Sequence, residues 1–208
     1  MINKSVDIDQ LVDYEVLEMA ILEYLKGSYS EEYILEQLRI NISGENRIKK
    51  GLRIVKKVVL NNQLSSLICE NKSEVIRALN NKDDKSIIII SLLNSAFPFA
   101  YDLLSIFGKF FKVQDLINIK VIQKEVSKVY GGNRVAVNGI YCVGPIFEKA
   151  GIYSRPKQGL YQIEDKLRPI HSVTKKIFIE SFNINQSITP TIIDELNPYF
   201  QFITFEKI

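Results

Sequence analysis

Two successive segments between residues 116 and 150 carry hydrophobic residues at helical spacing. The apolar positions that line one face of the first predicted helix are Ile119, Ile122, Val126 and Val129. Those of the second are Ala136, Ile140, Val143 and Phe147. Gly131 and Gly132 separate the segments, because glycine accepts the left-handed backbone that follows a helix, and Asn133 is a favourable N-cap. The pattern predicts a helix, a tight turn and a second helix.

A short hairpin is predicted directly after the second helix. The runs Ile152–Tyr153 and Leu160–Ile163 are apolar and aromatic, and a loop with proline and glycine joins them, as between two strands. Arg155 and Lys157 lie in this loop, so we expect a positively charged tip. Helix, turn, helix and hairpin follow one another in a winged helix-turn-helix. This order makes DNA the first partner to consider.

The residues expected to contact DNA lie on the solvent side of this unit. Three lysines of the first helix are four residues apart and form one basic stripe: Lys120, Lys124 and Lys128. The second helix leaves a polar set at its start and outer side: Asn133, Arg134, Asn138 and Tyr141. We expect Arg134, Asn138 and Tyr141 to reach base edges or sugars. The lysines, together with Arg155 and Lys157 of the wing, are expected to neutralise phosphates.

Helical spacing also marks the first sixty residues, where helices are expected over residues 8–26, about 30–39 and 46–57. The third of these has six basic residues in twelve, and Lys49 and Arg53 are expected to point outward. Helix, turn and basic helix is again a helix-turn-helix order, so Lys49 and Arg53 are further candidates for DNA contact. The alternative is a solvated face balanced by the acidic first helix. The direction of Arg53 distinguishes the two.

An apolar run without charged residues spans positions 86–101. It is shorter than the ~20 apolar residues that a bilayer requires, and it contains Asn94 and Pro98, so we expect a central core helix that ends at Pro98. A further helix over residues 101–111 would begin the winged unit. A second proline, Pro145, predicts that the second helix of the unit bends at Val143 or Gly144, or restarts at Pro145.

The predicted fold is mainly α and has three regions. A helical domain is expected over residues 1–100 and a winged helix-turn-helix with a short β-hairpin wing over residues 101–163. A C-terminal α/β extension, residues 164–208, is expected to pack on the core.

Local patterns in this extension are weaker than in the rest of the chain. Residues 173–182 fit a helix or a strand, since their apolar positions match the two-residue period of a strand as well as the period of a helix. Thr189 and Pro190 predict the start of a short helix to Leu196. Residues 199–205 predict a strand.

The distribution of charge changes this picture more than its sum, which is only +3 in 208 residues. Residues 1–40 hold nine acidic and three basic side chains, whereas residues 114–160 hold seven basic and three acidic ones. Positive charge therefore gathers where the winged unit is predicted, as a phosphate-contacting surface requires. The polar N-terminus has no signal-peptide pattern, and Cys69 and Cys142 lie far apart in apolar contexts. A cytoplasmic protein with reduced, buried cysteines is expected.

Candidate catalytic and metal-binding groups are sparse, so we expect no enzyme activity, no cofactor and no metal. His171 is the single histidine, and no CxxC or glycine-rich phosphate loop occurs. Residues 164–166 form a Glu-x-Lys triplet of the kind that metal-dependent nucleases use. A nuclease also needs an acidic residue on a preceding strand, and such triplets arise by chance, so this alternative is disfavoured.

The order of elements resembles a known family. An N-terminal helical region leads through a turn with Asn41 to a basic helix, Arg47 to Lys57, and then to an apolar helical segment, Ile87 to Phe111. Helix, turn and helix follow and close in FEKAGI, Phe147 to Ile152. This layout, over residues 10–160, is similar to that of the BrxA family of BREX phage-defence systems. The resemblance implies a helical domain paired with a winged-helix-like region, and DNA binding; we carry over the function class only.

The sequence therefore predicts a non-enzymatic protein that binds double-stranded DNA through a basic winged helix. The resemblance implies a component of a BREX-like phage-defence system. Expected partners are double-stranded DNA and, through the resemblance, other defence-system proteins, but no membrane. The alternative is a helical protein-interaction adaptor whose winged helix docks a partner protein. A homodimer is an open alternative to a monomer.

Overall fold

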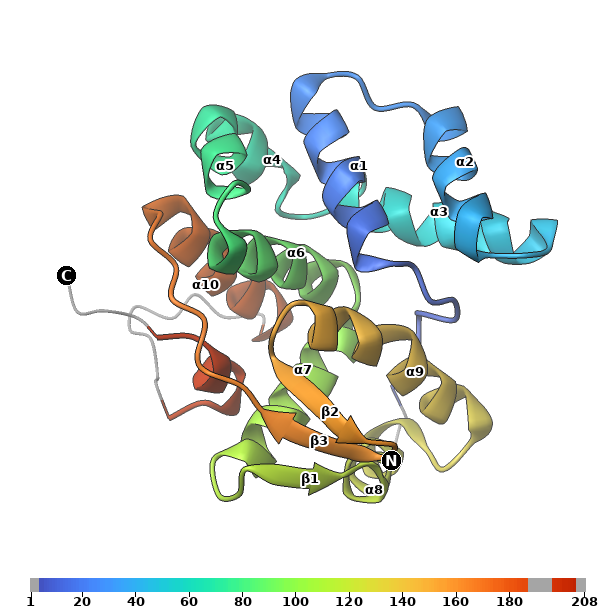
Figure 1. Ribbon diagram of the computed structural model, residues 1–208, viewed down its shortest axis with the longest axis vertical. Coiled ribbons are helices and arrows are strands. Elements are labelled where there is room, and N and C mark those ends of the chain that lie inside the picture. The colour runs from blue at the N-terminus through green and yellow to red at the C-terminus, as the bar shows by residue number, and fades with distance from the viewer. Residues whose placement is uncertain (1–3, 187–195, 205–208) are drawn as a thin grey trace.

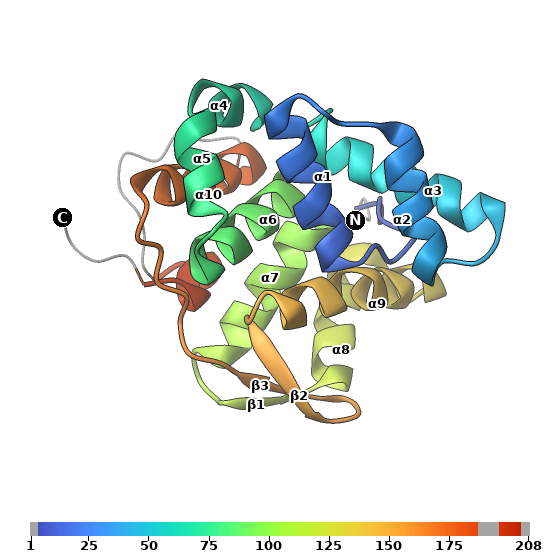
Figure 2. The same cartoon turned by 45° about the horizontal axis from the view of Figure 1, so that its top comes forward.

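The computed structural model describes residues 4–186 and 196–204, and the chain is mainly helical with one small sheet (Figure 1, Figure 2). The helices are α1 (Tyr14–Lys26), α2 (Glu31–Asn41), α3 (Glu45–Val59), α4 (Ser65–Glu70), α5 (Lys72–Ala78), α6 (Lys82–Ala96), α7 (Pro98–Phe111), α8 (Ile119–Tyr130), α9 (Arg134–Lys149), α10 (Ser172–Gln186) and the 3-10 helix η1 (Pro198–Phe202). The strands are β1 (Leu116–Asn118), β2 (Tyr153–Lys157) and β3 (Leu160–Ile163). The mainly helical fold agrees with the prediction.

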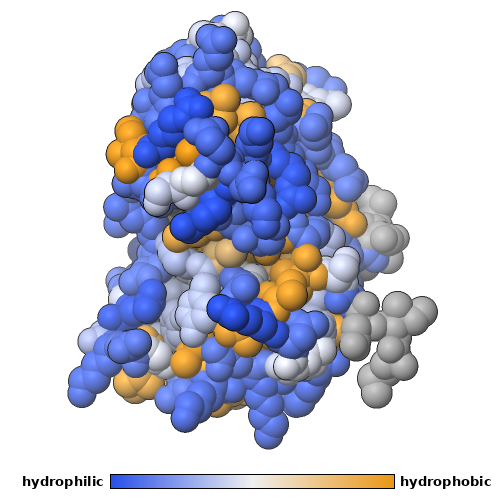
Figure 3. All heavy atoms as spheres, turned by 90° about the vertical axis from the view of Figure 1, so that its right-hand side faces the viewer, coloured by the Kyte–Doolittle hydropathy of each residue, from blue (hydrophilic) through white to orange (hydrophobic). Residues whose placement is uncertain are grey.

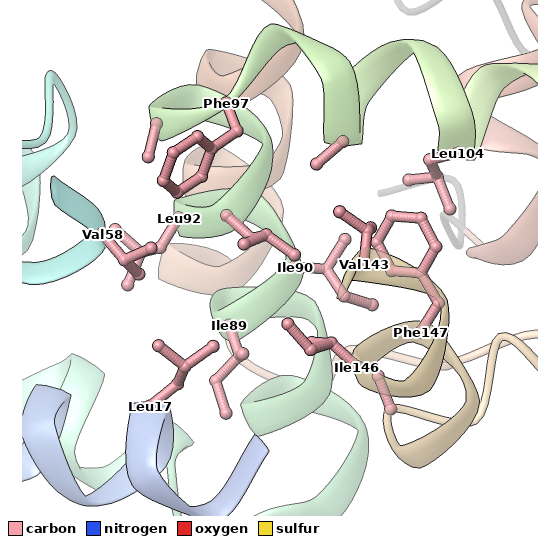
Figure 4. Close-up of a cluster of buried hydrophobic side chains, with 14 of the residues drawn as sticks. Leu17, Val58, Ile89, Ile90, Leu92, Phe97, Leu104, Val143, Ile146 and Phe147 are labelled. Carbon is pink, nitrogen blue, oxygen red and sulfur yellow. The ribbon is translucent and has the colours of Figure 1, made fainter. Parts of the chain in front are cut away.

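Hydrophobic side chains gather around α6, whereas the surface shown in Figure 3 is mostly hydrophilic and exposes hydrophobic residues in small groups. Every residue of α6 from Ser86 to Ala96 is buried. Side chains of α1 and α3 pack on one side of this helix, and those of α7 and α9 on the other (Figure 4). The predicted core helix is confirmed: α6 ends at Ala96 and Pro98 opens α7. Among the described residues, no helix has the length and apolar character needed to cross a membrane.

The N-terminal residues differ from the prediction of a helix over residues 8–26. Helix α1 begins only at Tyr14, and residues 4–12 form an extended arm in which Ile8 and Val12 are 1% exposed. The arm packs against α9, since a Cβ placed at Gly139 would lie 2.8 Å from Cγ1 of Val6. The arm stays extended because its apolar residues fill the core while its carboxylates pair with α3.

The segment from α7 to β3 forms a compact unit at one end of the molecule (Figure 2). Its antiparallel strands lie in the order β1-β3-β2. Helices α8 and α9 and the β2–β3 hairpin confirm the predicted elements, but β1 was not expected. Helix α9 runs through Pro145 as one helix, so the prediction that it restarts there is wrong.

Of the two alternatives for residues 173–182, the helix is the correct one, since these residues lie in α10. The strand predicted over residues 199–205 is wrong for its described part. Asn197 caps a 3-10 turn at Tyr199, and Ile203 makes one isolated bridge to Leu167. Tyr199 fixes this turn because its hydroxyl is buried and hydrogen-bonded to Asn94 and Ser181. The helix predicted from Thr189 and Pro190 lies outside the described residues, apart from Leu196.

The two cysteines are unpaired, as expected for reduced thiols. Cys142 is buried in α9, and burial raises the pKa of its thiol to about 11. Cys69 is exposed, so the prediction that both are buried is wrong for this residue. It is the last residue but one of the short helix α4, which leaves it on the surface.

Candidate nucleic-acid interface

The start of α8 and the turn of the β2–β3 hairpin are joined directly. The backbone N–H of Ile119 donates a 2.8 Å hydrogen bond to the carbonyl of Gly159. Leu160 pairs with Lys157 on one side and with Asn118 on the other, so the ends of all three strands lie in one row. Asn118 also caps α8 by accepting a hydrogen bond from the backbone of Lys120. Lys120 and Lys157 are therefore held at the same edge of the unit.

The basic stripe of α8 exists as predicted, with Lys120, Lys124 and Lys128 all exposed. Lys128 forms a salt bridge with Glu125, and its hydrogen bond to this carboxylate is the main reason that the pKa of Glu125 lies below its ordinary value. Within residues 4–186 and 196–204, no carboxylate pairs with Lys120 or Lys124. Two of the three lysines therefore present uncompensated positive charge.

Helix α9 presents the predicted polar residues on one side. Asn133 caps it by accepting a 3.1 Å hydrogen bond from the backbone of Ala136. Arg134, Asn138 and Tyr141 are exposed at positions i, i+4 and i+7, and 53% of Tyr141 is accessible. They form one stripe along the outer side of the helix.

One exposed residue of α9 was missed by the sequence analysis. Val135 is 51% exposed beside Arg134, although it had no assigned role. The sequence gives no signal for this exposure, because a valine at that position also fits the buried face of the helix. It adds an exposed apolar side chain to the start of α9.

The C-terminal part of α9 lies beside the hairpin, where Glu148 pairs with Arg155 and the carbonyl of Gly144 accepts a hydrogen bond from Tyr153. Burial raises the pKa of Tyr161 in β3, and the positive charge of Arg155 lowers it. The guanidinium of Arg155 is 5.9 Å from the Tyr161 ring centre and 3.4 Å from Glu148 of α9. Arg155 and Lys157 were predicted at the hairpin tip, but both lie on β2, which extends to the turn.

The basic helix α3 differs from this surface, because carboxylates of the N-terminal arm pair with its cations. Arg53 points toward Asp9, with 2.6 Å between Nη2 and Oδ1, and Lys50 lies 2.8 Å from the same carboxylate. Further ion pairs join Lys56 to Glu31 and Lys57 to Asp7. The direction of Arg53 favours the alternative of a balanced surface, although the balancing carboxylates stand mainly in the arm. Lys49 is exposed, and no ion pair within the described ranges involves it.

The Glu-x-Lys triplet and the single histidine are the other candidates for chemistry in the sequence. Residues 164–166 are exposed and line an open cleft of about 440 Å³ together with Asp83 and Glu148. The part of the chain that the structure describes contains no group of three or more histidine, cysteine or acidic residues placed to hold a metal ion. His171 contacts the buried carboxylate of Asp84 at 3.1 Å. Its role in the fold is therefore to anchor the segment before α10.

The surface of α8, α9 and the hairpin offers cations, amides and a phenol, which can bind an anionic polymer by charge and hydrogen bonding. In comparisons with protein-family models, curated proteins and solved structures, nothing matches this chain.

Proposed function

We propose that α7, β1, α8, α9, β2 and β3 act as a winged helix-turn-helix that binds double-stranded DNA without catalysing a reaction. The observation that carries the proposal is the hydrogen bond from Ile119 to Gly159. It holds the uncompensated lysine at the start of α8 and the lysine at the end of β2 at one edge of the unit that presents α9. Cations at one edge of such a unit can neutralise phosphates that border the major groove.

In this proposal α9 enters the major groove, which is wide enough for one helix. Arg134 and Asn138 stand at the start of α9, and their guanidinium and amide groups can pair with the edges of guanine and adenine. Tyr141 and Arg155 contact the sugar-phosphate backbone beside the groove. Lys120 and Lys157 neutralise phosphates along the edge that they share. The side-chain oxygen of Asn133 caps α9, so its amide nitrogen is the group that remains to donate a hydrogen bond to a phosphate.

We extend the proposal to a role in a BREX-like phage-defence system. Its support is the layout of a helical region, a basic helix and a helix-turn-helix unit in the order that resembles the BrxA family. Arg53 takes no part in the proposed interface, because Asp9 pairs with it. Protection of a host against phage should then depend on Arg134 and Lys157 but not on Arg53.

The experiment is a titration of a fluorescent duplex with the protein, followed by anisotropy at two salt concentrations in EDTA. The test variant is Arg155→Glu with Lys157→Glu. The matched control is Lys72→Glu with Lys176→Glu, which makes the same charge change on α5 and α10, across the molecule from α8 and α9 (Figure 1).

We expect affinity for the duplex that falls steeply with salt, because each neutralised phosphate releases counterions. The wing variant should bind more weakly than the control, and the slope of log K against log salt should shrink by roughly 2, one for each lost phosphate contact. Equal binding by the two variants would remove the wing from the interface. If the wild type does not bind at low salt, the unit is a docking module for a protein partner.

A further inference from the structure

Helices α1 and α2 enclose an open cleft of about 490 Å³. Val16 and Met19 of α1 and Ile40 of α2 supply its apolar walls, and Asp13 stands at one end. Ile40 is 69% exposed and Met19 is partly exposed, so a ligand in the cleft can reach both. The cleft therefore combines these three apolar side chains with the polar side chains of Asp13, Glu15, Gln37 and Asn41.

The exposed side of α2 continues this apolar surface. Tyr33 is 43% exposed and stands seven residues before Ile40, on the same face of the helix. The opposite face holds Ile34 and Leu38, which are buried against α3, where a Cβ at Gly51 would lie 3.2 Å from Leu38. The packing of α2 on α3 therefore uses one face of α2 and leaves the face with Tyr33 and Ile40 uncovered. Small hydrophobic groups interrupt the hydrophilic surface on the side that α2 and α3 occupy (Figure 3).

The charge around this apolar surface is negative and incompletely paired. Glu32 and Glu36 are exposed on α2, and across the described ranges no lysine, arginine or histidine pairs with either. Asp13 accepts a 2.7 Å hydrogen bond from Asn41, a neutral group that leaves the charge of the carboxylate in place. Glu15 is paired with Lys149, and the hydrogen bond from this lysine is the main reason that its pKa is lowered. Three carboxylates thus remain available for a cation.

We propose that the cleft between α1 and α2 binds a cationic amphipathic helix of a partner protein. The apolar side of that helix would cover Val16, Met19 and Ile40, and its lysines or arginines would pair with Asp13 and Glu36. Hydrophobic residues at helical spacing that enter an apolar groove are a common mode of recognition between proteins, and opposite charges on the rim fix the orientation. Nucleic acid is repelled by the same carboxylates. This proposal does not rest on DNA binding.

Met19 makes the site directly observable, because the chain contains only two methionines. Protein labelled with methyl-¹³C methionine gives few methyl signals, and a Met19→Leu variant assigns the one in the cleft. The probe is a synthetic leucine-lysine peptide of about 14 residues, roughly four helical turns, with leucines on one face. The control peptide has glutamate at every lysine position. Both are added to the full chain without DNA.

We expect the lysine peptide, and not the glutamate peptide, to shift the Met19 signal in a saturable manner. A variant with Asp13→Asn and Glu36→Gln keeps an N-cap residue before α1 and should bind the lysine peptide about fivefold more weakly, as two exposed ion pairs contribute. The matched control, Glu70→Gln with Glu180→Gln, neutralises two exposed carboxylates on α4 and α10 and should bind like the wild type.

Three results would overturn the proposal. The Met19 signal could stay in place at saturating lysine peptide, or it could respond equally to the glutamate peptide. The Asp13 and Glu36 variant could also bind the lysine peptide as tightly as the control variant. Each of these means that the cleft does not recognise a cationic helix. Thermal unfolding of both variants separates a lost contact from a lost fold.

Discussion

The backbone N–H of Ile119 and the carbonyl of Gly159 form a 2.8 Å hydrogen bond that ties the first turn of α8 to the turn of the hairpin. The first N–H groups of a helix have no partner within it, so this bond satisfies a group that would otherwise need water. Gly159 adopts a φ of +78°, which favours glycine. The position of the hairpin relative to α8 therefore depends on this residue.

Replacing Gly159 with alanine should destabilise the protein and weaken DNA binding. The new Cβ would lie 3.3 Å from Cγ2 of Ile119, and the left-handed backbone costs a non-glycine residue roughly 1 kcal/mol. For a chain of this size we expect Tm to fall by about 2–4 °C. Thermal unfolding and duplex anisotropy measure the two effects. Gly132→Ala is the control, because no atom lies within 4 Å of a Cβ there; an equal loss in both variants would show that the hairpin contact is not the cause.

Val135 should contact a thymine methyl group if α9 enters the major groove. The 5-methyl of thymine is the apolar group there, and Val135 is the exposed apolar side chain beside Arg134. A duplex with deoxyuridine in place of thymidine should bind the wild type about fourfold more weakly, as one buried methyl contributes about 0.8 kcal/mol. Val135→Ala should bind both duplexes alike in the same anisotropy assay. Full discrimination by the variant would place the valine away from the bases.

Long periodic elements of this fold are predictable from the sequence because their causes are local. The cap at Asn133, the glycines before it and the apolar spacing all lie within α8 and α9 or next to them. The strand β1 is not predictable in this way, since Leu116–Asn118 becomes a strand only by pairing with β3. The 3-10 turn at Tyr199 likewise depends on a hydroxyl contact with Asn94, which is 105 residues away.

In the candidate interface, too, local features are predictable from the sequence and long-range contacts are not. Helical periodicity identifies the lysine stripe of α8 and the polar stripe of α9 without any tertiary information. It does not reveal which cations are already paired: Arg53 and Asp9 are 44 residues apart, and only the path of the N-terminal arm brings them together. The balance of long-range ion pairs therefore separates α3 from α8 as candidate surfaces.

Asp84 should be essential for the attachment of the segment before α10. This carboxylate is fully buried and accepts hydrogen bonds from the backbone N–H groups of Ile170 and His171 and from the His171 ring. Asp84→Ala leaves these donors without a partner, at a cost of about 2–3 kcal/mol. Circular dichroism should show Tm lowered by about 5–10 °C. Asp83→Ala, which loses one bond to the backbone of Arg168, should have a smaller effect, and equal losses would contradict this assignment.

Asp9 should make the stability of the protein depend on acid pH. Burial opposes its ionisation, but the hydrogen bond from Lys50 and the charges of Arg53 and Lys50 outweigh burial and hold the pKa of Asp9 below its ordinary value of 3.8. A carboxyl group whose pKa is lowered by folding contributes stability above its unfolded pKa. This contribution is lost as the pH falls through the lower pKa of the folded state.

Asp9→Asn should therefore lower the free energy of unfolding at pH 7 by about 1 kcal/mol, the upper range for an exposed ion pair. The difference from the wild type should shrink as the pH falls below 3.8 and disappear once the pH lies below the lowered pKa of Asp9 in the folded state, where both side chains are uncharged. Urea unfolding at several pH values measures it. Glu32→Gln, which changes a carboxylate with no ion pair in the described chain, should show no such pH dependence. A constant difference between Asp9→Asn and the wild type at all pH values would mean that the arm is held by its apolar residues alone.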